Sequence, residues 1–131
     1  MAHVPANPQL TVDGYWGVAT TRALCDYFDI SSGRNGDFIV RGQYQPNIDA
    51  NPGLVASAWV DDGTLAGDDV IRKLQGFNAG LTKDGILGTN TIKTIQDIVG
   101  LPAKYQDGVL DAPSNTIKSL QTMLNNGSLL R

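Results

Sequence analysis

The sequence predicts an all-α fold, a bundle of short helices arranged as two pseudo-repeats with Asp-Gly loops. One observation is a five-residue phrase (Ile, a base, any residue, Leu or Ile, then Gln) at 71–75, 92–96 and 117–121, with a worn copy at 21–25. A second is that residues 10–17 followed by Thr20 match residues 81–88 followed by Thr91 at a constant offset. Self-similarity of this kind is typical of duplicated turn-plus-helix units, which more often present a binding surface than a reaction centre.

Each phrase is predicted to be a short amphipathic helix, because apolar residues recur at spacings of three and four. One stripe consists of Ile92, Ile95 and Val99, and the next consists of Ile117, Leu120 and Leu124. Residues able to cap a helix start stand ahead of the stripes: Thr20, Thr91, Asp68 or Asp69, and Ser114 or Asn115. Gly100 and Gly127 are expected to end the last two helices.

The first half of the chain matches the repeat only in part. It has the loop at 13–17 and a helix expected from about Val18 to Phe28, but its first helix is missing or degenerate. Residues 38–40 are expected to form a short strand that pairs near 12–16 in a minor β-hairpin. Pro46 and Pro52 argue against a further regular helix, so 47–58 is predicted to be a long packed connection.

Two pseudo-repeats follow from this pattern. Residues 1–60 form a partial N-terminal pseudo-repeat, and residues 61–131 form a C-terminal three-helix pseudo-repeat. We expect one continuous module, because either half alone buries little apolar surface.

Composition narrows the function. With 131 residues, 41% of them apolar, the chain is expected to fold as a globular protein. A net charge of −3 disfavours nucleic-acid binding, which depends on clustered Lys and Arg. No apolar run is long enough to insert in a membrane, and the N-terminus lacks the features of a signal peptide.

Catalytic groups are scarce in the sequence. All 13 acids are Asp, and the pairs Asp61-Asp62 and Asp68-Asp69 read as turn and helix-start residues because adjacent side chains point apart. The single histidine, His3, lies near the chain start, and the single cysteine, Cys25, is expected to be a packed thiol. We therefore expect no enzyme activity in this chain, no metal and no cofactor. A small enzyme that uses Asp pairs stays the rival hypothesis.

Residues 12–24 resemble the peptidoglycan-binding-like modules at the C-terminal ends of phage endolysins. The likeness continues through 68–74, 83–92, 107–109 and 117–120, and through Arg41–Tyr44 with Asn47-Ile48. The resemblance implies a helical cell-wall-binding module, covalently linked to a muramidase, amidase or peptidase domain, that acts at the bacterial cell wall during phage lysis. Cys25 and a lengthened third loop depart from the pattern. The alternative is a protein–protein interaction or assembly domain of a phage or secreted complex.

Binding of neutral wall sugars or amidated peptides would use aromatic faces and polar side chains. The candidate ligand-binding residues are Tyr15, Trp16, Arg22, Gln43, Tyr44, Asn47 and Trp59. Core packing is the favoured alternative for Trp16, which aligns with Leu87, and for Trp59, which is flanked by the small Ala58 and by Val60. Plain solvent exposure is the alternative for Arg22, whereas Tyr15 and Tyr44 suit either role equally.

Overall fold

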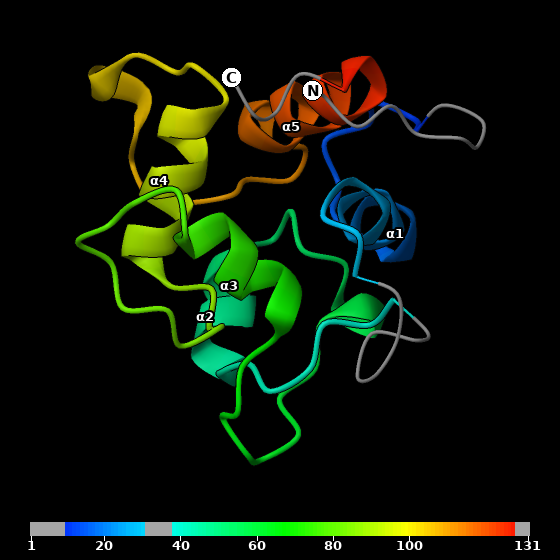
Figure 1. Cartoon of the computed structure of the whole chain (residues 1–131), viewed down its shortest axis with the longest axis vertical. Coiled ribbons are helices and arrows are strands. Elements are labelled where there is room, and N and C mark those ends of the chain that lie inside the picture. Colours follow the sequence, from blue (N-terminus) through cyan, green and yellow to red (C-terminus); the bar gives the residue numbers. More distant parts are fainter. Residues whose placement is uncertain (1–9, 31–37, 128–131) are drawn as a thin grey trace.

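The computed structural model describes residues 10–30 and 38–127, and this part of the chain is mainly helical, as predicted (Figure 1). The α-helices are α1 (Val18–Tyr27), α2 (Gln45–Ala50), α3 (Asp69–Gln75), α4 (Thr89–Ile98) and α5 (Asn115–Asn126). Two short 3-10 turns, η2 (Ala56–Ala58) and η3 (Ala103–Tyr105), lie in the connections. Each of the four phrases falls in a helix, α1, α3, α4 or α5.

The four helices share one core, to which α1 and α3 to α5 contribute the same phrase positions. Leu24, Leu74, Ile95 and Leu120 are each at most 1% exposed. Helix α1 packs against both α5 and α3, and α3 packs against α4, so the chain's last helix lies beside its first (Figure 1). None of the helices in the described ranges 10–30 and 38–127 is long and apolar enough to cross a membrane.

The predicted caps are half right. Asp68 accepts a hydrogen bond from the Val70 amide at 2.9 Å, and Ser114 accepts one from the Ile117 amide at 3.1 Å, as expected. Thr20 and Thr91 are not caps, because α1 and α4 begin earlier, after Gly17 and Gly88. At the other helix ends, Gly100 and Gly127 adopt the expected left-handed conformation, with φ of 87° and 65°.

The predicted β-hairpin is wrong. In the described residues, Trp16 forms an isolated parallel bridge with Leu54, and Val40 forms one with Trp59. Both bridges go to the connection between α2 and α3, which also carries the indole of Trp59 to the carbonyl of Trp16 at 3.1 Å. The connection therefore takes the hydrogen-bonding positions that the hairpin required.

Residues 47–58, predicted as a long connection, are more regular than expected, since they include the end of the six-residue helix α2 and the turn η2. Pro46 lies in the first turn of this helix, where its missing N–H and fixed φ are tolerated. The presence of proline therefore decided where α2 begins, and did not forbid it.

Candidate functional site

In the three phrases that end in Gln, the glutamine side chain forms hydrogen bonds with an Asp-Gly loop. In α4, Gln96 accepts a hydrogen bond from the Gly108 amide at 3.0 Å. Its Nε2 donates to the Asp107 carboxylate at 3.0 Å and to the Thr116 hydroxyl at 3.2 Å. These bonds with Gln96 and the Val109 amide lower the pKa of the exposed Asp107 carboxyl. One buried amide thus fixes the loop and the first turn of the next helix.

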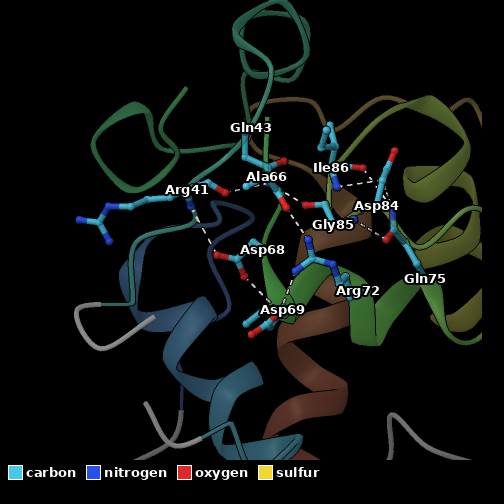
Figure 2. Close-up of polar contacts among 11 residues, drawn as sticks. Arg41, Gln43, Ala66, Asp68, Asp69, Arg72, Gln75, Asp84, Gly85 and Ile86 are labelled. Atoms are coloured by element: carbon cyan, nitrogen blue, oxygen red, sulfur yellow. Dashed lines mark hydrogen bonds and ion pairs between the residues drawn. The ribbon is translucent and has the colours of Figure 1, made fainter. Parts of the chain in front are cut away.

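The same arrangement occurs twice more. In α3, Gln75 accepts from Gly85 at 2.9 Å and donates to Asp84 and Thr91 at 2.9 and 3.1 Å (Figure 2). In α5, Gln121 accepts from Gly14 at 3.1 Å and donates to Asp13 and Thr20 at 3.1 Å each. Thr20 and Thr91, predicted as caps, are instead loop partners of these glutamines.

We call each of these glutamines, Gln75, Gln96 and Gln121, a clamp. The three clamps join successive units, and the last one joins the end of the chain to its beginning. Helix α3 holds the loop before α4, α4 holds the loop before α5, and α5 holds the loop before α1. The Asp-Gly glycines need positive φ as well as close approach. At Gly85, with φ of 77°, an added Cβ would lie 2.5 Å from the Asp68 amide nitrogen.

Cys25 occupies the fourth glutamine position, in α1. Burial, helped by the nearby Asp68 and Asp26 carboxylates, raises the pKa of this thiol to about 11. The side chain is 1% exposed, so it is a packed neutral thiol, as predicted. The buried Asp68 carboxylate caps α3 and accepts a hydrogen bond from the Arg41 amide at 3.4 Å (Figure 2). Near Cys25, therefore, a carboxylate bonds the backbone in place of a glutamine amide.

A second set of contacts explains why the residue that follows each Asp-Gly loop is buried. The amides of Trp16, Leu87 and Leu110 donate to the Gly53 carbonyl, the Gln43 side chain and the Asn51 side chain, at 2.9 Å in each case. All three donors are at most 1% exposed. Trp16 therefore fills the core position that Leu87 and Leu110 fill in the other units.

A groove of about 700 Å³ runs along α1, beside the loop that α5 clamps. Its walls combine apolar and polar side chains: Leu10, Tyr15, Val18, Arg22, Asp26, Val55 and Asn125, among others. Tyr15 is 40% exposed and Val18 is 42% exposed. Ala19 and Ala23 keep the middle of the helix face low, which leaves room for a ligand.

The structure separates the seven candidate ligand-binding residues. Tyr15 and Arg22 come together in the α1 groove. Trp16 and Trp59 are buried, and their rings form an edge-to-face pair with centroids 5.0 Å apart. Gln43 is 1% exposed and spans the Gly85 carbonyl and the Leu87 amide (Figure 2).

Tyr44, just before α2, and Asn47, within α2, lie apart from the α1 groove. Tyr44 is the residue before α2 and is 49% exposed, and Asn47 is half-buried within α2. Neither lines the α1 groove. Of the seven residues, Tyr15 and Arg22 line the α1 groove.

Sequence reasoning missed Ala19, Ala23, Asp26 and Val55 as groove residues. The first three share one helix face with Arg22 at spacings of three and four, a signal present in the sequence. Val55 is distant in sequence, and only the fold brings it to the groove.

The paired acids have structural partners. Asp61 accepts from the Gln45 and Gly63 amides, and Asp62 accepts from the Thr64 amide and hydroxyl. Asp68 caps α3, while Asp69 pairs with Arg72 at 2.7 Å (Figure 2). Across residues 10–30 and 38–127, no three His, Cys, Asp or Glu side chains gather to hold a metal ion. His3 lies outside the described residues.

Comparisons with protein-family models, with curated proteins and with solved structures find no match for this chain. Function must therefore be argued from the groove itself.

Proposed function

We propose that this chain is a non-catalytic module that binds bacterial peptidoglycan and targets a linked lysin or autolysin domain to the cell wall. The observation that carries the proposal is the α1 groove, which an exposed tyrosine, an arginine and a carboxylate line together. The resemblance of residues 12–24 to endolysin wall-binding modules supports the same function.

The groove chemistry suits a wall fragment. The exposed ring of Tyr15 offers a flat apolar face with a hydroxyl group, which suits the mixed faces of a sugar ring. Arg22 and Asp26 add one charge of each sign along the helix. Wall polymers repeat the same element many times, so weak single sites are sufficient for retention.

A pelleting experiment tests the proposal. The purified chain is mixed with isolated Gram-positive walls, and the fraction that sediments with the walls is measured. The Tyr15→Ala variant should bind about tenfold more weakly, the loss expected when a central aromatic contact is removed, with an unchanged unfolding transition. If the wild-type chain stays in the supernatant with every wall type, the proposal is wrong.

Tyr105→Ala is the matched control. Tyr105 is 57% exposed, more than Tyr15, but it lies in η3 and outside the lining of the groove. Its loss should leave sedimentation unchanged. Equal losses for Tyr15→Ala and Tyr105→Ala would indicate nonspecific adsorption through exposed rings. Tyr44→Ala changes a candidate ligand-binding residue outside the groove, so it tests whether the binding surface extends to α2.

A further inference from the structure

A second groove, of about 610 Å³, lies along α4. Five of its lining residues occupy repeat positions that also line the α1 groove. The helix faces correspond residue by residue, with Ala19, Arg22 and Ala23 of α1 matched by Asn90, Lys93 and Thr94 of α4. Leu10 and Leu81 also correspond, each in the segment that leads into an Asp-Gly loop. Duplication of the unit has therefore duplicated its groove.

Both grooves carry a base followed four residues later by an acid, Arg22 with Asp26 and Lys93 with Asp97. A base on the N-terminal side of an acid is the weaker orientation for pairing within a helix. Each acid is also the second-last residue of its helix, where the helix dipole disfavours negative charge. Helix stability therefore does not account for placing these acids here twice.

The charges point to a ligand that carries both signs. Residues four apart on a helix are neighbours on its surface, with Cβ atoms about 6 Å apart. An ammonium and a carboxylate on one short ligand are matched by such a pair. A peptide of the wall that carries free amino and carboxyl groups has this chemistry, whereas a neutral glycan does not.

The two grooves differ in their apolar walls. Tyr15, Val18 and Val55 line the first, whereas Phe77 and Ile98 line the second. Phe77 is 39% exposed, close to the 40% of Tyr15, so each groove offers one accessible aromatic ring. Asp97 also accepts a long bond, 3.5 Å, from Gln106, which lines the same groove. The second groove thus keeps the charged helix face of the first but takes its aromatic ring from a different position of the repeat.

We propose that the α4 groove is a second binding site that takes the same zwitterionic peptide element of the wall as the α1 groove, which makes the chain bivalent. This inference rests on the proposed wall-binding function. Two sites on one rigid unit raise retention on a repetitive polymer by effective concentration, on the order of 100-fold or more, without changing the affinity for a single fragment.

The test uses the full chain and a soluble disaccharide-peptide with free amino and carboxyl groups. Amide chemical shifts should move on both α1 and α4, and calorimetry should give two fragments per chain. The double variant Lys93→Ala/Asp97→Ala should lose the α4 shifts and bind one fragment. Its retention on whole walls should fall on the order of 100-fold.

The control variant is Asp69→Ala/Arg72→Ala, which removes an acid and a base from α3 outside both grooves. It should keep two sites and full retention. If shifts are confined to α1 with one fragment per chain while wild-type protein still sediments with walls, the second site is refuted and the proposed function stands. If neither walls nor fragment bind, both fail. Equal binding of a peptide-free glycan to both grooves would refute the zwitterionic ligand.

Discussion

Replacing Gln121 with Met should destabilise the protein by removing the clamp that closes the last helix on the first loop. Met has similar length and bulk but carries no amide. The change removes the acceptor for the Asp13 and Gly14 amides, at 3.0 and 3.1 Å, and the donor to the Thr20 hydroxyl. Tyr15 also loses a 2.9 Å bond to its carbonyl oxygen.

The expected magnitude follows from the buried partners. Gly14 and Thr20 are buried, and a buried polar group left without a partner costs about 1–3 kcal/mol. The Thr20 hydroxyl keeps a 3.4 Å contact with the Tyr15 carbonyl, which reduces its share. We therefore expect a loss of about 2–4 kcal/mol, which lowers Tm by roughly 8–16 °C for a chain of this size.

Urea denaturation followed by circular dichroism measures this loss directly. Gln45→Met is the control, because the Gln45 amide bonds Asp49 at the exposed surface, and its loss should stay within about 0.5 kcal/mol. Gln75→Met and Gln96→Met should lower the free energy of unfolding by as much as Gln121→Met, since the contacts of these glutamines are equivalent. A loss below about 0.5 kcal/mol for Gln121→Met, with an unchanged denaturant slope, would refute the clamp argument.

Three further outcomes follow from the geometry. Gly85→Ala should cost more than about 2 kcal/mol in urea denaturation, whereas Gly63→Ala, also at positive φ but with open space around it, should cost only about 1 kcal/mol. Cys25 should react with iodoacetamide at pH 8 roughly 100-fold more slowly in native than in unfolded protein. Because the pKa of this thiol is raised to about 11, its contribution to stability should be lost as pH rises from about 9 toward 11. An NMR titration should place the Asp107 pKa below 3.8, so its contribution to stability, present at neutral pH, should disappear as pH falls through that lowered value, and Asn at this position should abolish the effect.

Local features of the sequence were sufficient for the four helices that carry the phrases, but not for α2. The spacing of Ile92, Ile95 and their counterparts is a property of neighbouring residues, and burial of every phrase confirms it. Asp68 and Ser114 were predictable as caps because a cap bonds within its own first turn. Thr20 and Thr91 were mispredicted because a distant glutamine amide takes their hydroxyl oxygen.

The candidate site was less predictable. Tyr15 and Arg22 were found because they are aromatic or polar, but Trp16, Gln43 and Trp59 are also aromatic or polar and are buried in the protein. An exposed aromatic ring and a buried one look alike in a sequence. Only the number of atoms packed around each ring separates a ligand platform from a core residue.

By itself, the sequence determined the repeated unit, its helices, its Asp-Gly turns and the mismatch at Cys25. The tertiary structure decided how the units join, because the partners of Gln121 are 101 to 108 residues away along the chain and no local pattern encodes these contacts. The tertiary structure also decided that Gln43 and Asn51 accept hydrogen bonds from the buried Leu87 and Leu110 amides. These polar side chains are buried because buried amides need acceptors. The α1 groove is also a product of the tertiary structure, because Val55, Gln121 and Asn125 line it from segments distant in sequence.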